Sequence, residues 1–335
     1  MQKFLIIQTA FIGDVVLATA VAEKLHLYYP EAQIDFFVRK GNELLFDGHP
    51  FIKKVWVWNK RENKLFNLFK LIRQVRKENY DEVINLQRFF SSGLLTVFSG
   101  AKYTSGFTIN PLSVFFTQRK THHISRNGVL HEVARNQQLI QHLTDVDYAK
   151  PRLYPSFADQ QNIKHLIGQP YICCAPGSVW FTKQYPKSHW IAFLKQLPTD
   201  LVIYFIGAKT DRNLIDELIE VTENSQAQNL SGELSFLESA ALMKGAVMNF
   251  ANDSAPMHFA TALNAPITAI FCSTVPAFGY GPLSNTSIIL ETPENLKCRP
   301  CGIHGLKKCP LGHFKCAYTI LPERLVRIVY ERRNK

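Results

Sequence analysis

An acidic side chain follows the first apolar run of the chain, in the stretch FLIIQTAFIGDVVLATAVAEKL, residues 4–25. An ionised carboxylate at Asp14 can accept a proton from a hydroxyl group, as a general base does. The same position also suits an N-cap, which stabilises a helix by about 1 kcal/mol. Neither a G-x-G-x-x-G fingerprint nor a G-x-x-x-x-G-K-[ST] loop occurs here, so we do not expect a diphosphate at this turn. The turn is left free for the other reactant.

A second polar stretch, APGSVWFTKQYPKSHW, follows an apolar run at residues 175–190. A glycine lets backbone approach a ligand closely, and a lysine ammonium near a diphosphate neutralises leaving-group charge without a metal. The candidate donor-binding residues here are Gly177, Ser178, Thr182 and Lys183, with Lys187 as a further charge. The alternative is a solvated basic loop.

The third stretch, FANDSAPMHFATAL, spans residues 250–263 and combines a polar turn with a helix start. Proline suits the first turn of a helix, and the free N–H groups of that turn can bind an anion. Asp253 would orient Lys183 or accept sugar hydroxyls, while His258 is either a ligand contact or a structural hydrogen-bonder. The candidate residues are Asn252, Asp253, Ser254, Ala255 and His258.

Four cysteines lie near the C-terminus, in CRPCGIHGLKKCPLGHFKC. The first two have the C-x2-C spacing of a zinc ligand pair, but the later spacings differ from those of common zinc ribbons. A structural zinc, a redox pair and free thiols therefore all remain open for Cys298, Cys301, Cys309 and Cys316. Their distance in sequence from the other motifs argues against a catalytic metal.

The composition limits the class of protein and its partners. The chain has 335 residues, 46% of them hydrophobic, and a formal net charge of +11. This length predicts more than one domain, and the charge favours anionic partners such as nucleic acid, an anionic membrane face or a phosphorylated substrate. No apolar stretch reaches membrane-spanning length, and the first apolar run is too short for a secretion signal. We therefore expect a cytoplasmic protein.

Short apolar runs alternate with helical patterns along the whole chain, which is typical of parallel sheets covered by helices. The pattern restarts after a proline-bearing linker at residues 149–156, which predicts two doubly wound domains. The predicted strands are 4–8, 33–38, 53–57, 82–86, 171–175, 201–206, 247–251 and 267–271. The predicted helices are 14–28, 64–78, 130–143, 188–197, 211–222, 235–244 and 255–263, with a final helical pattern from Pro322 to Arg333.

The three motifs resemble, in order, those of glycosyltransferase family 9, the ADP-heptose:lipopolysaccharide heptosyltransferases. The likeness spans nearly the whole chain, and the cysteine stretch resembles that of many heptosyltransferase II members. It implies an α/β GT-B fold, with two Rossmann-like domains facing a central cleft. Residues 1–150 would bind the acceptor and 151–320 the nucleotide sugar, while the helix in 321–335 would pack back on the N-terminal domain.

The resemblance also implies an activity and assigns residue roles. The activity is inverting, metal-independent transfer of heptose from ADP-heptose to the inner core of lipopolysaccharide, with no cofactor. Asp14 would be the catalytic base, Lys183 would contact the diphosphate, and Ser178 would be a phosphate-loop hydroxyl. Asp253 would contact the lysine and the sugar, and Asp211 would match loosely an acid that binds the ribose.

Acceptor-side residues are chosen by charge and loop position, and they are Gly13, Arg88, Lys120 and His123, with Arg119 and His122 as further candidates. The stretch at residues 53–77 interleaves bases with aromatics and would meet an anionic acceptor or the cytoplasmic membrane face; a solvated helix face is the alternative. A related enzyme that uses another nucleotide sugar also fits. An NAD-dependent oxidoreductase is disfavoured because the glycine fingerprint is missing, and a nucleic-acid-binding protein because no recognition motif is found.

Overall fold

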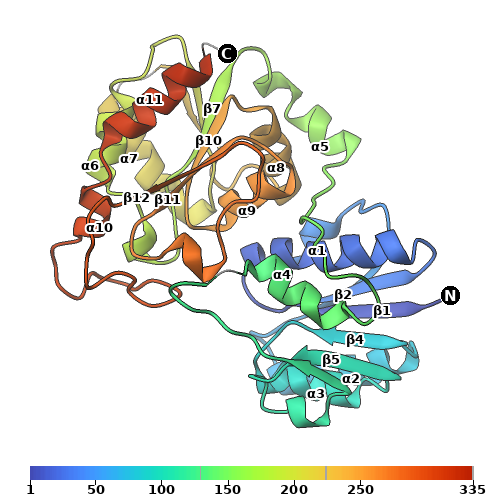
Figure 1. Cartoon of the computed structure of the whole chain (residues 1–335). Coiled ribbons are helices and arrows are strands. Elements are labelled where there is room, and N and C mark those ends of the chain that lie inside the picture. Colours follow the sequence, from blue (N-terminus) through green and yellow to red (C-terminus); the bar gives the residue numbers. More distant parts are fainter. Residues whose placement is uncertain (129, 223–224, 334–335) are drawn as a thin grey trace. The chain divides into compact units, whose positions relative to one another are not determined.

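The computed structural model describes residues 1–128, 130–222 and 225–333 of the chain. Its contacts divide the chain into two units, each built around one sheet (Figure 1). The N-terminal unit contains residues 1–124 and 130–154. The C-terminal unit contains residues 125–128 and continues from Pro155 to the end of the described chain.

The sheet of the N-terminal unit has six strands in the order β3-β2-β1-β4-β5-β6, and each neighbouring pair is parallel. The central strand β1 is buried at four consecutive positions, as expected for a sheet that helices cover on both faces. The strands are β1 Lys3–Ile7, β2 Gln33–Arg39, β3 Ile52–Trp58, β4 Glu82–Asn85, β5 Tyr103–Phe107 and β6 Gln118–Lys120. The helices are α1 Ile12–Tyr28, α2 Lys64–Lys77, α3 Phe90–Phe98 and α4 Glu132–Gln137.

Helix α2 packs on this sheet through one apolar stripe. Leu68, Ile72 and Val75 recur at helical spacing and are all buried. They join Trp58 and Tyr80 in the same hydrophobic cluster. The inward face of α2 is therefore already satisfied by the core of its own unit.

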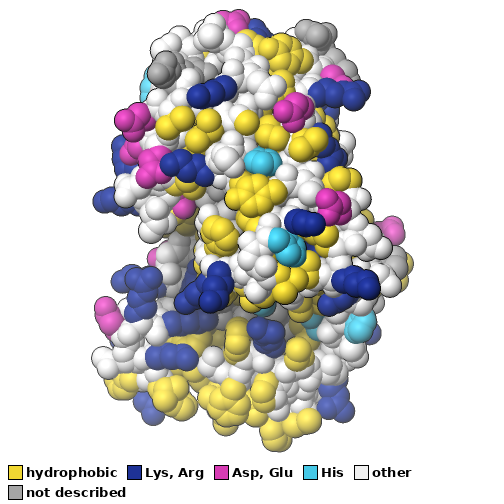
Figure 2. Space-filling view, turned by 90° about the vertical axis from the view of Figure 1, so that its left-hand side faces the viewer, with side chains coloured by type: hydrophobic (Ala, Val, Ile, Leu, Met, Phe, Trp, Pro, Cys, Tyr) yellow, Lys and Arg dark blue, Asp and Glu magenta, His cyan; other side chains and the backbone are white. Residues whose placement is uncertain are grey.

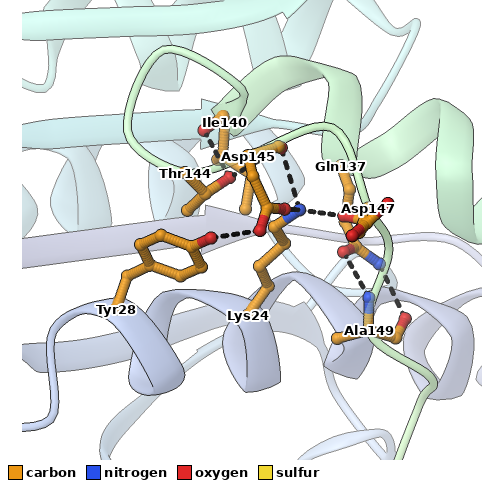
Figure 3. A network of polar contacts seen from close by, with 8 residues as sticks. All are labelled: Lys24, Tyr28, Gln137, Ile140, Thr144, Asp145, Asp147 and Ala149. Carbon is orange, nitrogen blue, oxygen red and sulfur yellow. Dashed lines mark hydrogen bonds and ion pairs between the residues drawn. The ribbon is translucent and has the colours of Figure 1, made fainter.

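The segment after α4 is held against α1 (Figure 3). Lys24, only 2% exposed, donates from Nζ to the Asp145 carboxylate at 2.6 Å, and the Tyr28 hydroxyl donates to the same carboxylate. The Gln137 side-chain amide bonds both backbone groups of Ala149 at 2.8 Å. These contacts keep the chain in the N-terminal unit beyond its last strand.

The sheet of the C-terminal unit repeats this design, with six parallel strands in the order β12-β11-β10-β7-β8-β9. Its strands are β7 Tyr171–Ala175, β8 Val202–Phe205, β9 Ala227–Asn229, β10 Met248–Asn252, β11 Ile267–Phe271 and β12 Ser287–Glu291. Its helices are α5 Phe157–Asn162, α6 Lys187–Leu194, α7 Arg212–Thr222, α8 Phe236–Gly245, α9 Ala255–Ala262, α10 Lys315–Tyr318 and α11 Pro322–Arg333.

The last helix, α11, belongs to the core of the C-terminal unit. Leu325, Ile328 and Val329 lie in the same buried cluster as Trp190, and α11 lies beside α6 in Figure 1. Arg333 is paired with Asp200 of this unit at 2.7 Å. The described contacts thus give α11 a place in the C-terminal unit, and packing of this helix on the N-terminal domain stays a prediction.

The eight predicted strands are all present, with ends that shift by at most one residue, but four further strands were not predicted. β6 and β9 have only three residues each and β12 is a partly exposed edge strand, so they lack a buried apolar run. β5 contains a serine and a glycine. The predicted helix 130–143 is shorter, since α4 ends at Gln137 and a 3-10 turn follows.

Candidate active site

Asp14 lies in the first turn of α1, directly after the carboxyl end of β1. The N-cap is Phe11, whose side chain makes no capping hydrogen bond, so Asp14 is not the N-cap. Its side chain is partly exposed, and the preceding Gly13 is buried. The positive end of the α1 dipole stabilises a negative charge at this position. A carboxylate is thereby presented at the strand edge where open α/β sheets bind ligands.

Two bases lie close to this edge; sequence reasoning missed Arg39 and included Lys60 only within the basic stretch at residues 53–77. Arg39 ends β2, and the neighbouring Asp14 charge opposes the burial that lowers the pKa of its guanidinium. Lys60 follows β3 and donates from Nζ to the Thr9 carbonyl at 2.7 Å. Burial, with Arg39 and Lys64 nearby, lowers the pKa of Lys60 to about 8. Arg39 is the last residue of β2, and Lys60 lies two residues beyond the end of β3. A base at the carboxyl end of a predicted strand was therefore the signal that could have found them.

The predicted acceptor-side residues follow the other strands of the same parallel sheet. Arg88, which comes after β4, is exposed and lies 5.4 Å from the Phe89 ring centroid. Lys120 ends β6, and His123 is exposed just beyond it. His122 instead bonds the buried Glu132 carboxylate at 3.0 Å, which gives it a structural contact. An acceptor role for Arg88, Lys120 and His123 remains a prediction.

In the C-terminal unit, two motifs meet because β7 and β10 are neighbours in the sheet. Lys183, after β7, forms an ion pair with Asp253, after β10, at 2.7 Å between Nζ and Oδ2. The Thr274 hydroxyl donates to the same carboxylate oxygen at 2.7 Å. The side chains of Lys183 and Asp253 are only 15% and 8% exposed. The ammonium is thus held in a fixed position by a buried acid, as the sequence predicted for Asp253.

Two further candidates from these motifs serve to hold the loops together. The Asn252 amide, fully buried, accepts from the Tyr185 backbone N–H at 3.0 Å and donates to the Pro176 carbonyl at 2.8 Å. Thr182 is 1% exposed, and its hydroxyl oxygen accepts from the Ser273 hydroxyl at 2.9 Å. These contacts position the loop after β7, while direct contact of Asn252 or Thr182 with a donor remains a prediction.

Asp211 lies beside Gly177, as two neighbouring strands end there. A Cβ on Gly177 would come within 2.4 Å of the Asp211 carboxyl carbon, and one on Gly207 within 2.7 Å of its Oδ2. The Ala208 backbone N–H donates to Oδ2 at 2.8 Å, while burial raises the pKa of Asp211. Glycine is needed at position 177 because the Asp211 carboxylate occupies the space that a side chain there would fill.

This contact gives a direct test. Gly177→Ala should misplace Asp211, lower the free energy of unfolding by about 1–3 kcal/mol and weaken the binding of ADP. Adding Asp211→Ala to Gly177→Ala should restore most of the stability, because the clash is then relieved. Urea unfolding and calorimetry with ADP would measure both effects. Equal stability of Gly177→Ala and the parent would show that the loop adapts and that the contact is unimportant.

The remaining donor candidates surround the same loops. Ser178 is partly exposed on the loop after β7, and Ser254 is the N-cap of α9, with its hydroxyl donating to the Asn252 carbonyl at 3.3 Å. Ala255 begins α9, and His258 is buried in it. The start of α9 therefore lies next to the Lys183–Asp253 pair, which favours an anion near Ser254 and Ala255.

The cysteine stretch is distant in sequence from the other motifs, but the structure brings it against the donor loop. Leu306 exchanges two hydrogen bonds with Thr182, at 3.1 and 2.7 Å. A Cβ on Gly305, which has a φ of +78°, would come within 2.9 Å of the Lys183 side chain. The Phe314 ring stacks on Phe181 at 5.3 Å between centroids. The segment therefore braces the donor loop, although it is distant in sequence.

Whether this stretch holds a zinc ion stays a prediction. Across residues 1–128, 130–222 and 225–333, no three His, Cys, Asp or Glu side chains form a group that could hold a metal ion. The four thiols are free, and Cys298 instead has its Sγ 3.8 Å from the His313 Nε2. Burial raises the pKa of the Cys301 and Cys316 thiols, and Cys298 and Cys309 lie close enough to raise the pKa of both further. Zinc, a redox pair and free thiols therefore all stay open.

Comparison with known proteins gives a consistent result. A sequence model described as glycosyltransferase family 9 (heptosyltransferase) matches residues 68–305, a range that includes both the Lys183 and the Asp253 loops. Lipopolysaccharide heptosyltransferase 3 of Escherichia coli is 26% identical over 292 residues, which cover 83% of this chain and 85% of that protein.

Solved structures show the same fold. The structure titled E. coli ADP-heptose lps heptosyltransferase II has a TM-score of 0.79 at 20% identity and covers 99% of this chain and 98% of its own. E. coli heptosyltransferase WaaC with ADP has a TM-score of 0.75 at 18% identity, with 99% and 100% covered. Three findings agree with one another. They are the two Rossmann-like sheets, the buried lysine–aspartate pair in one unit and the family match over most of the chain. The protein therefore belongs to glycosyltransferase family 9, the heptosyltransferases, and is a glycosyltransferase.

Proposed function

We propose that this protein transfers heptose from ADP-heptose to the inner core of lipopolysaccharide, with inversion and without a catalytic metal. The observation that carries the proposal is the buried Lys183–Asp253 ion pair beside the start of α9. The relatives named as lipopolysaccharide heptosyltransferases support the sugar and the acceptor. The WaaC structure with ADP supports the nucleotide.

The C-terminal unit holds the donor in this proposal. The Lys183 ammonium and the free amides at the start of α9 bind the diphosphate and stabilise the negative charge of departing ADP. Asp253 accepts sugar hydroxyls with the lone pairs that Lys183 and Thr274 leave free. Asp211 accepts hydroxyls of the ribose, for which its place beside Gly177 suits it. A fixed cation at the leaving group supplies the charge that a metal ion would otherwise provide.

The N-terminal unit prepares the nucleophile. Asp14 takes the proton of the acceptor hydroxyl as that oxygen attacks the anomeric carbon opposite the nucleotide. The bond to the diphosphate oxygen breaks through a transition state like an oxocarbenium ion, and ADP leaves as the anion. Attack from the opposite face inverts the configuration. A carboxylate at this turn can accept the proton of the attacking hydroxyl, whereas a phosphate-binding glycine could not.

The bases beside Asp14 suit an anionic acceptor. Arg39 and Lys60 place two positive groups near the carboxylate, and the partial burial of Lys60 strengthens its attraction to an anion. A sugar that carries a carboxylate or phosphate would be fixed there, with its hydroxyl toward Asp14. A lipid-anchored acceptor of this kind would bring the reaction to the cytoplasmic face of the membrane.

This assignment predicts a pH dependence for acceptor binding. Because the pKa of Lys60 is lowered to about 8, its charge is lost as the pH rises from 7 to 9. The KM for the acceptor should therefore rise by up to about tenfold over that range. A Lys60→Arg variant stays charged, so its KM should be nearly constant from pH 7 to 9. The same rise in both proteins would remove Lys60 from acceptor binding.

The test of the proposed function uses a panel of nucleotide sugars, namely ADP-heptose, ADP-glucose, UDP-glucose and GDP-mannose. Each is incubated with a delipidated inner-core saccharide, and the released nucleoside diphosphate is identified by chromatography. Release of ADP from ADP-heptose alone, with a heptosylated product in the mass spectrum, supports the proposal. Release of UDP or GDP would contradict the proposal that the donor nucleotide is ADP. Equal use of ADP-glucose would contradict the proposal that the transferred sugar is heptose.

A further inference from the structure

Helix α2 exposes a second apolar face in addition to the one that it buries. Leu65, Phe66 and Phe69 are 61%, 71% and 51% exposed, while Leu68 and Ile72 face the core. Only one apolar stripe is needed to pack a surface helix, so the exposed rings are not explained by folding. Helix α3, which packs against α2, adds an exposed aromatic side chain, Phe98.

The same face of α2 is strongly basic. Phe66, Phe69, Lys70 and Arg73 are spaced by three and four residues and therefore share one side of the helix. The sequence of α2 has five bases and no acid, with Lys64, Arg76 and Lys77 as the other bases. In the part of the chain that the structure describes, none of these five bases is paired with a carboxylate. Figure 2 shows hydrophobic side chains along the lower edge, with Lys and Arg above them.

We propose that this basic aromatic face of α2 docks the protein on an anionic lipid bilayer. Phenyl rings insert at the boundary between headgroups and acyl chains, while lysine and arginine contact lipid phosphates. No helix among the described residues has both the length and the hydrophobicity to cross a bilayer, so the contact is peripheral. The inference extends the proposed function, because it places the enzyme at the surface that carries a lipid-anchored acceptor.

The charge of the face distinguishes a bilayer from other occupants. A second copy of the same face would bring Lys70 and Arg73 against the same two bases, and like charges across an interface are strongly unfavourable. A purely apolar partner would leave the bases without counter-charges. An anionic bilayer supplies both an apolar layer and a continuous surface of phosphates. It can therefore bury the exposed rings and give the bases their counter-charges at the same time.

The experiment is vesicle flotation of the full chain, without nucleotide or acceptor. Vesicles of equimolar phosphatidylethanolamine and phosphatidylglycerol should carry the protein upward, whereas phosphatidylcholine vesicles should not. Binding should weaken as salt is raised well above 0.1 M, where the Debye length falls below about 10 Å. Since no sugar or nucleotide is present, the result does not depend on which sugar the enzyme transfers.

Matched variants locate the binding surface. Lys70→Gln with Arg73→Gln should reduce the partition coefficient by about 30-fold, or roughly fivefold for each base. Phe66→Ser should reduce it by roughly tenfold, while Phe157→Ser should have no effect, because Phe157 is 76% exposed but lies on α5. Lys164→Gln with Lys195→Gln removes the same net charge from exposed positions of the C-terminal unit and should change binding far less.

Several results would overturn the proposal. The parent protein could fail to float with anionic vesicles, or the α2 variants could bind no more weakly than their matched controls. A change in sedimentation of the Phe66→Ser variant without vesicles would instead make this face an interface between copies. Transfer to the delipidated saccharide should stay at the parental rate in all the variants; loss of that activity would mean that α2 acts on the fold and not on lipid.

Discussion

Lys183→Ala is expected to abolish most donor binding and to lower turnover by about 10² to 10³-fold. The reason is that Lys183 is the ammonium held beside the start of α9, and removing one group that stabilises a leaving anion costs about that factor. The loss should be seen both in calorimetry with ADP and in the rate of transfer. Unchanged affinity for ADP would remove Lys183 from the donor site, and the proposed role of the C-terminal unit would fail with it.

Two controls separate this effect from misfolding. Lys187 lies four residues further along the chain, at the start of α6, but its ammonium pairs with Glu217 on the surface, and its side chain is 42% exposed. Lys187→Ala should therefore leave ADP affinity and turnover near those of the parent. Lys183→Ala alone leaves the buried Asp253 uncompensated, which can cost 3–5 kcal/mol of stability. Combining Lys183→Met with Asp253→Asn removes both charges, so stability should recover while donor binding stays lost.

The fold could be predicted largely because its buried strands are continuous apolar runs. β1, β7, β10 and β11 lie in the centre of their sheets and were found within one residue. Of the four strands that were missed, β6, β9 and β12 are edge strands, and a strand with one open side needs no continuous apolar run. The order of strands in each sheet also had to come from the structure, since pairing between distant segments leaves no trace in one sequence.

Part of the candidate site could also be predicted from the buried strands, because functional side chains follow their carboxyl ends. Lys183 and Asp253 could be paired in advance, since each follows the end of a buried strand and a parallel sheet brings such ends to one edge. Gly305 and Leu306 could not, because they reach the donor loop through an irregular segment with no periodic pattern. Lys60 was hidden in a run of similar bases at residues 53–77, and only its partial burial sets it apart.

Asp14→Asn is expected to lower turnover by about 10² to 10⁴-fold, the usual contribution of a general base, while leaving the affinity for ADP nearly unchanged. An amide at this position keeps the size of the side chain but cannot accept the hydroxyl proton. The nucleotide is held by loops of the C-terminal unit, so its binding is not affected. Single-turnover rates with saturating donor, together with calorimetry on the same protein, would measure the two quantities separately.

A second explanation must be separated from catalysis, because Asp14 also interacts with the partly buried Arg39. If the carboxylate only held that guanidinium in place, Asp14→Asn would raise the KM for the acceptor and leave turnover at saturation unchanged. A base instead loses turnover at every acceptor concentration, together with the acidic limb of the pH–rate profile. Glu23→Gln is the matched control, because Glu23 lies on the same helix but accepts a hydrogen bond from Tyr154 at 3.0 Å and should retain parental turnover. Full activity of Asp14→Asn would mean that another group, or water, takes the proton.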